Sequence, residues 1–136
     1  MTPRLELVRK WLVKADADLR SANASATLAE PIRDTACFHC QQAVEKALKA
    51  LLTLHEIPCD PVHSIDYLMD LCCPLDTELE RYRLQGRDLT AYAVKYRYPG
   101  TPEEPSLQDL MEAIECTDSI YSRIVDCVPQ ECRPQS

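Results

Sequence analysis

Four residues of this chain have the spacing of a zinc site. Cys37 and Cys40 are separated by two residues, and Cys59 and His63 follow with three residues between them. Thiolates and imidazoles at such spacings bind Zn²⁺ in many proteins. The intervening sequence predicts a helix over 41–55, however, which would carry the second pair about 20 Å along the helix axis. Four ligands of one metal ion must lie within a few Å of each other, so we expect no metal here and interpret the cysteines as core residues.

A second group of polar residues lies on one arc of the same predicted helix and includes His39, Gln42 and Lys46. A metal-independent ribonuclease can use a histidine as general base, with an arginine that holds the phosphate. Arg33 precedes His39 on this helix, but at about 100° per residue the two side chains point about 120° apart. They do not converge within one chain, so His39 is either an ordinary, partly exposed residue or part of a site that two subunits share.

The third group is a dense aromatic and cationic cluster, formed by Tyr92, Tyr96, Arg97 and Tyr98. An arginine can donate two hydrogen bonds to a phosphate or carboxylate, and an aromatic face can stack on a nucleobase. The alternative is structural: the tyrosines pack inward with their hydroxyl groups at the rim, and Arg97 pairs with an acid. Both interpretations are open at this stage.

The second of these groups lies within the segment 37–54, CFHCQQAVEKALKALLTL, around which the fold is organised. Its apolar residues cover about 200° of a helical wheel, roughly twice the arc that a surface helix needs. The sequence therefore predicts a central helix that other helices contact from at least two sides. Glu45 and Lys49 follow each other in the favourable i, i+4 order. Trp11, beside the apolar stripe of the preceding helix, faces either the core or a partner.

Prolines and N-capping residues predict where the helices begin and end. The expected helices run from Thr2-Pro3 to Pro31, from Pro31 to about His55, from Ser64 to Pro74, from Thr77 to Tyr98, and from Ser106 to Pro129. The fourth begins with a capping box, Thr77 with Glu80, and Gly86 interrupts or weakens it. No stretch alternates with period two for long enough to form a strand.

These elements predict an all-α fold, a bundle of four long helices plus one short helix. A single domain is expected over 1–128, followed by a disordered tail over 129–136. The formal net charge of −7 and the absence of a Lys/Arg cluster argue against general nucleic-acid binding. We expect a cytoplasmic protein with reduced thiols, because no signal peptide and no membrane-spanning run precede the eight cysteines. Of these, Cys127 and Cys132 are the pair most prone to oxidation.

Three motifs in a fixed order resemble the HEPN domain family. They are FHCQQAVEKALKALL at 38–52, HSIDYLMDLC at 63–72 and LTAYAVKYRYPG at 89–100. The segment ADADLRSA at 15–22 fits the first helix of the same family. The resemblance covers roughly residues 8–126. It implies an up-and-down helical bundle that pairs into a homodimer, often encoded beside a minimal nucleotidyltransferase in toxin–antitoxin systems or acting as a nucleotide-binding partner.

Many HEPN domains are metal-independent ribonucleases with an arginine followed, after four to six residues, by a histidine. Arg97 fits the arginine, but the corresponding later positions hold Pro102, Glu103 and Glu104. Without that histidine, an arginine alone only binds phosphate. We therefore expect a non-catalytic or weakly catalytic module without a cofactor, which binds a nucleotide or a nucleotidyltransferase partner. The alternative is an atypical ribonuclease built from Arg97 and His39 of facing subunits.

By this interpretation, the candidate nucleotide- and phosphate-binding residues come from two parts of the chain. They are Arg97, Tyr96, Tyr98, Tyr92, Lys46, Gln42 and His39.

Overall fold

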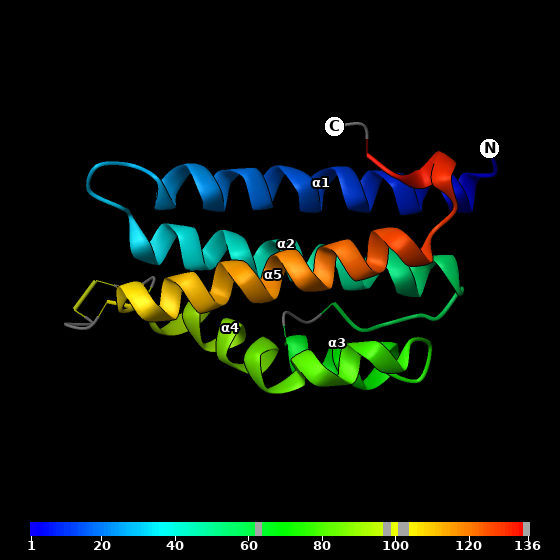
Figure 1. The fold of residues 1–136 in the computed structure, drawn as a ribbon. Helices are drawn as coiled ribbons and strands as arrows, with labels where there is room; N and C mark the ends of the chain where they lie inside the picture. Colours follow the sequence, from blue (N-terminus) through cyan, green and yellow to red (C-terminus); the bar gives the residue numbers. More distant parts are fainter. Residues whose placement is uncertain (62–63, 97–98, 101–103, 135–136) are drawn as a thin grey trace.

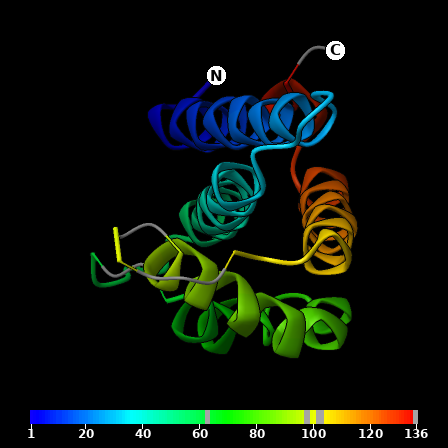
Figure 2. The ribbon, with the colours of Figure 1, turned by 90° about the vertical axis from the view of Figure 1, so that its left-hand side faces the viewer.

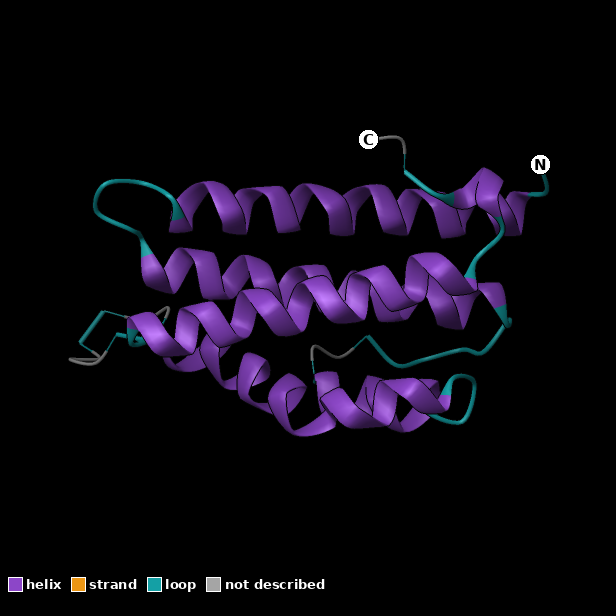
Figure 3. Cartoon of the chain, in the orientation of Figure 1, coloured by secondary structure: helices purple, strands orange, loops and turns teal. Residues whose placement is uncertain are grey.

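The computed structural model describes residues 1–61, 64–96, 99–100 and 104–134. All regular elements of this described part are helices, as Figure 3 shows. The α-helices are α1 (Pro3–Ala26), α2 (Arg33–Leu54), α3 (Ile65–Cys72), α4 (Arg83–Lys95) and α5 (Leu107–Cys127), and the 3-10 helices are η1 (Thr77–Tyr82) and η2 (Gln130–Cys132). The predicted all-α fold class is confirmed.

Helix α2 is the centre of the bundle, as its wide apolar arc predicts. It contacts α1, α3, α4 and α5. Figure 1 shows α1 along one side of the bundle and α3 and α4 along the opposite side, with α2 and α5 between them. Seen from the end of the bundle in Figure 2, α5 lies beside α2 and completes the middle layer. No helix of the described part is both long enough and apolar enough to span a bilayer.

Three of the predicted helix starts are confirmed by their caps. The Thr2 hydroxyl accepts a hydrogen bond from the Leu5 N–H at 3.2 Å, and Ser64 caps α3 in the same way. At the start of α5, Ser106 and Asp109 form a reciprocal capping box with distances of 3.0 and 3.1 Å. Such caps satisfy backbone N–H groups that have no partner inside the helix.

The fourth helical segment begins differently from the prediction. Asp76, not Thr77, is the N-cap, and its carboxylate accepts from the Glu78 N–H at 3.3 Å. The predicted capping box does not form, because Glu80 instead pairs with Arg83 at 3.0 Å. The first turns are a 3-10 helix, η1, and the α-helix starts only at Arg83.

Gly86 does not interrupt α4, and its absent side chain has a packing role. A Cβ atom at this position would lie 2.8 Å from Cγ2 of Ile65 on α3. The same residue, Ile65, donates its backbone N–H to the Thr90 hydroxyl at 3.0 Å. Helices α3 and α4 are therefore in closer contact than a larger residue at position 86 would permit.

The chain after α5 differs from the disordered tail expected from the sequence. Residues 130–132 form η2, and Cys132 is fully buried there, with its thiol donating to the Leu5 carbonyl at 3.5 Å. Pro129 ends α5, and the chain then turns back onto α1. Residues 135–136 lie outside the described part.

All eight cysteines are free thiols, and most of them belong to the core. Burial raises the pKa of Cys40 to about 11 and that of Cys72 to about 12. Cys127 and Cys132, the pair expected to oxidise most readily, contact different acceptors: the Cys127 thiol donates to Asp76 at 3.3 Å. Of the predicted zinc spacing, Cys37 and Cys40 are buried in the core, and His63 lies outside the described residues.

Candidate functional site

A carboxylate of α1 holds two of the predicted site residues of α2. Asp18 lies 2.9 Å from Nδ1 of His39 and 2.5 Å from Nζ of Lys46. His39 and Lys46 are seven residues apart, two turns along one face of α2, so both can contact a single side chain. The Asp18 side chain is only 12% exposed. This arrangement orients the imidazole through Nδ1 and leaves Nε2 as the nitrogen that a ligand can contact.

Lys46 therefore already has an anionic partner within the chain. Its ammonium group is balanced by Asp18, and the pair is mostly shielded from solvent. Asp18 belongs to the segment ADADLRSA, but the sequence did not identify it as a partner of α2. The sequence does show an acidic residue on the helix before the one that carries His39 and Lys46. That pattern is common, and it identifies no contact unless the packing of the two helices is known.

The predicted site residue Gln42 is half-buried and takes part in a hydrogen-bond network along α2. Its side-chain amide donates to Gln41 at 2.7 Å, and Gln41 donates to Glu45 at 3.2 Å. Glu45 accepts from Lys49 at 2.8 Å, which confirms the predicted i, i+4 pair. Gln41 and Glu45 are buried, although the helical wheel places Glu45 on the polar arc.

Trp11 ends this network on the side of α1. It packs against the core, and the ammonium of Lys49 lies 5.5 Å from the centroid of its ring. The interaction between a cation and an aromatic face stabilises such an arrangement. The hydrogen bonds of this network thus run along α2, and the Lys49–Trp11 contact joins the network to α1.

At the end of α4, the structure describes two of the four residues of the predicted aromatic cluster. The rings of Tyr92 and Tyr96 are 5.6 Å apart at 38°, and Nζ of Lys95 lies 5.4 Å from the Tyr96 ring. Tyr92 is half-buried against the core, and burial raises its pKa. Arg97 and Tyr98 lie outside the described residues.

The side of Tyr92 that faces α5 is acidic. Tyr92 lines a groove between α4 and α5 together with Asp88, Asp109 and Glu112. Carboxylates at this density repel a phosphate group. Of the two described tyrosines, Tyr96, with Lys95 beside its ring, is therefore the better suited to an anionic ligand.

The two parts of the predicted phosphate site lie on different sides of α2. Cys37 lies near Tyr92 and Asp109, on the side of α4 and α5. His39 comes two residues later, about 200° around the helix, and contacts Asp18 of α1. The structure of one chain therefore brings His39 and Lys46 together but does not bring them to Tyr92 and Tyr96.

The angular separation predicted for Arg33 and His39 excludes a contact between them, and Arg33 indeed has a different partner. It pairs instead with Glu104 at 2.9 Å. Glu104 is one of the acids found where the ribonuclease signature has its histidine. The pair joins the first turn of α2 to the segment before α5.

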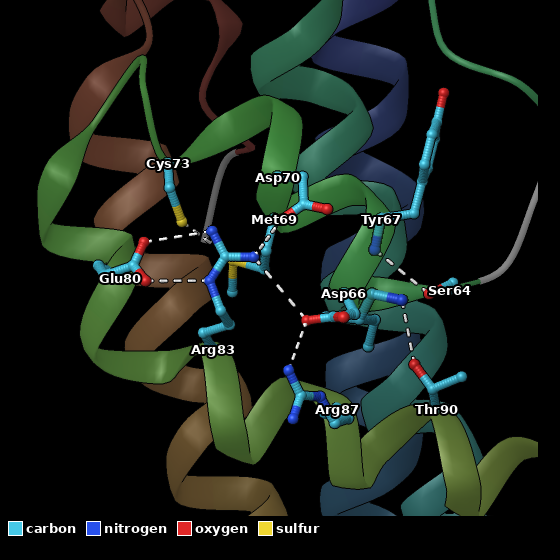
Figure 4. A network of polar contacts seen from close by, with 11 residues as sticks. Ser64, Asp66, Tyr67, Met69, Asp70, Cys73, Glu80, Arg83, Arg87 and Thr90 are labelled. Atoms are coloured by element: carbon cyan, nitrogen blue, oxygen red, sulfur yellow. Dashed lines mark hydrogen bonds and ion pairs between the residues drawn. The ribbon is translucent and has the colours of Figure 1, made fainter.

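A charged network fixes α4, and thereby its aromatic end, on α3 (Figure 4). The Arg83 guanidinium donates to both oxygens of Glu80, at 3.0 and 3.2 Å, and to Asp70. Arg87 donates to Asp66 at 3.3 Å. The two hydrogen bonds from Arg83 lower the pKa of Glu80.

Comparison with known proteins places this fold. The HEPN domain family matches residues 8–128. Among solved structures, TT1696 from Thermus thermophilus superposes with a TM-score of 0.76 at 28% identity, covering 90% of this chain and 99% of that one. An archaeal HEPN homologue, ST0689, superposes with a TM-score of 0.71 at 24% identity, covering 90% and 98%. None of the curated proteins matches the sequence.

The order of the helices and the central α2 define an all-α bundle of the HEPN type. The family match covers nearly the whole chain, and the chain therefore belongs to the HEPN domain family.

Proposed function

We propose that this HEPN domain is a binding module, which forms a homodimer and binds a nucleotide or a minimal nucleotidyltransferase, without catalysis within one chain. The observation that carries the proposal is the separation of His39 from the end of α4. His39 faces α1 and is held by Asp18, whereas Tyr96 lies on the other side of α2. A general base and a phosphate-binding group must converge on one substrate for general base catalysis.

The nucleotide would bind at the outer end of α4. Tyr96 offers an aromatic face for a base, and Lys95 beside it adds positive charge. Arg97 follows directly in the sequence, and an arginine side chain can bind a phosphate through two parallel hydrogen bonds. Tyr92 supports Tyr96 from the core side, next to the acidic groove.

Calorimetric titration of ATP, AMP and a short RNA tests the proposed nucleotide binding. Arg97→Lys should weaken binding although it keeps the charge, because lysine cannot form the bidentate contact. Tyr96→Ala should weaken it through loss of stacking, by about 1–3 kcal/mol. Arg20→Gln is the matched control, since this largely exposed arginine lies on α1, away from the end of α4, and the change should leave binding unchanged. No detectable binding by the wild type would leave the nucleotidyltransferase as the proposed partner.

One observation favours a ribonuclease as a second candidate function. Asp18 holds Nδ1 of His39 at 2.9 Å, which is how a carboxylate orients a catalytic imidazole. Arg97 would have to come from a second subunit. Incubation of labelled RNA with the protein in EDTA separates the two functions: a binding module leaves the RNA intact, whereas a ribonuclease degrades it and loses activity in His39→Ala.

A further inference from the structure

The α1–α2 connection and the start of α5 lie at the same end of the bundle (Figure 1), and both carry exposed apolar side chains. On α5, Leu107 is 54% and Met111 is 60% exposed. Leu28 and Ile32 in the connection are exposed to a similar degree. We call these four residues the end patch. A groove lined by Ala29, Glu30, Pro31, Arg33 and Leu107 joins its two parts.

The part of the end patch on α5 forms a ridge. Leu107 and Met111 are four residues apart, and the half-buried Ile114 continues the same face one turn further. The core-facing side of α5, which buries Leu110 and Ile124, borders this ridge. Ile114 itself packs against the core, whereas Leu107 and Met111 remain largely exposed, so the apolar surface of α5 extends beyond its core-facing side.

Both signs of charge border the end patch. Arg33 pairs with Glu104 at 2.9 Å, and Glu30 lines the same groove. The Arg33 side chain is 34% exposed and uses one of its nitrogens for Glu104, so N–H donors of the guanidinium remain for another acceptor. An isologous interface requires a self-complementary surface. Under a twofold axis, Arg33 of each copy can meet Glu30 of the other.

We propose that the end patch is the surface on which two copies of this chain pair. The apolar residues would form the centre of the interface, and Arg33 and Glu30 its charged rim. Mixed charges at the rim matter because each copy carries a formal net charge of −7, which opposes pairing elsewhere. This inference rests on the proposed homodimer and adds the surface through which it forms.

Light scattering after size-exclusion chromatography, over a range of protein concentrations, tests the surface. The wild type should have about twice the monomer mass of 15.5 kDa. Met111→Asp and Leu107→Asp should each raise the dimer dissociation constant at least about tenfold, because dimerisation would bury an unpaired charge. An aspartate at position 107 lies in the first turn of α5, where the helix dipole favours it, so the helix itself should not be weakened.

Leu84→Asp is the matched control, because Leu84 is 70% exposed on α4, outside the end patch. This variant should remain a dimer. A charge exchange gives an independent test: Arg33→Glu and Glu30→Arg should each weaken the dimer, whereas an equimolar mixture of the two variants should form a heterodimer. Within each variant, positions 30 and 33 carry the same charge, so opposite charges at these positions can meet only between copies. A helical CD spectrum unchanged from wild type shows that each variant is folded.

The possible failures are distinguishable. A wild type that stays monomeric throughout the concentration range would overturn both the homodimer and this surface. A dimeric wild type whose Met111→Asp and Leu107→Asp variants also remain dimeric would leave the homodimer standing and overturn the end patch as its interface.

Discussion

Asp76 and Arg123 join two segments that are far apart in the sequence. The Asp76 carboxylate accepts two hydrogen bonds from the Arg123 guanidinium, at 2.6 and 2.9 Å. The same carboxylate caps η1 through the Glu78 N–H. One nearly buried side chain thus sets the start of the η1–α4 segment and ties it to α5. The hydrogen bonds from Arg123 lower the pKa of Asp76 below its usual 3.8.

The first prediction concerns the stability that Asp76 provides and its dependence on pH. A lowered pKa in the folded state means that the carboxylate stabilises the fold above its unfolded pKa of about 4. That contribution is lost as pH falls through the folded pKa. At about pH 7, Asp76→Asn should cost about 1–3 kcal/mol, because Arg123 loses its charged acceptor. In thermal melts, the difference in melting temperature between wild type and Asp76→Asn should disappear below about pH 4.

The exposed Glu115 on α5 supplies the comparison for this measurement. Glu115→Gln should change stability by no more than about 0.5 kcal/mol at any of these pH values. If the difference in melting temperature between wild type and Asp76→Asn is the same at neutral and acidic pH, the ionisation of Asp76 contributes nothing to stability.

The second prediction concerns Asp18, which contacts His39 and Lys46 from α1. Asp18→Asn should lower the free energy of unfolding by about 1–3 kcal/mol, because two partly buried donors lose their charged acceptor. In a double-mutant cycle with Lys46→Met, the effects should not add, with a coupling of about 0.5–3 kcal/mol. Urea denaturation gives the values. Arg20→Gln, which removes an ion pair whose arginine is largely exposed, should cost no more than about 0.5 kcal/mol.

The third prediction uses the thiols as reporters of the core. Under native conditions near neutral pH, iodoacetamide should modify Cys59 first, because it lies in a loop and is only partly buried. Burial raises the pKa of Cys37 to about 12 and that of Cys127 to about 11, which suppresses their reactive thiolates. Mass spectrometry of the peptides follows each site, and in urea all eight should react. Native modification of Cys37 at the rate of Cys59 would contradict the packing around α2.

Features that depend on local sequence could be predicted, as the helix caps illustrate. Thr2, Ser64 and Ser106 each cap a helix through an N–H group three residues away, so the necessary information lies within one turn. At the start of the fourth segment, Asp76 and Thr77 are both suitable caps. The choice of Asp76 is supported by Arg123, which follows 47 positions later. No local pattern contains that contact.

The candidate site shows the same division. The sequence placed His39 and Lys46 on one face of α2, because helical periodicity determines which side chains share a face. It did not identify Asp18 as their partner, since that depends on how α1 packs against α2. Likewise, Glu45 occupies the polar arc of the wheel yet is buried, and only the packed bundle shows this.

The last prediction tests the close contact of α3 and α4 at Gly86. Alanine in the interior of a helix is favoured over glycine by about 1 kcal/mol. Here, however, its Cβ would lie 2.8 Å from Cγ2 of Ile65, which is fully buried and cannot move away freely. Overpacking of this kind costs about 1–3 kcal/mol. We therefore expect Gly86→Ala to destabilise the protein despite its better helix propensity, as measured by urea denaturation.

The Ile65→Ala background separates the two effects, because it removes the Cγ2 atom that Gly86→Ala would meet. Ile65→Ala alone should cost about 2–5 kcal/mol. Adding Gly86→Ala to it should then be neutral or stabilise by up to about 1 kcal/mol, since only the propensity term remains. Ala91→Gly, at an exposed position of α4, measures that propensity in the same helix. If Gly86→Ala stabilises the wild-type background as much as the Ile65→Ala background, the steric contact between the two helices does not exist.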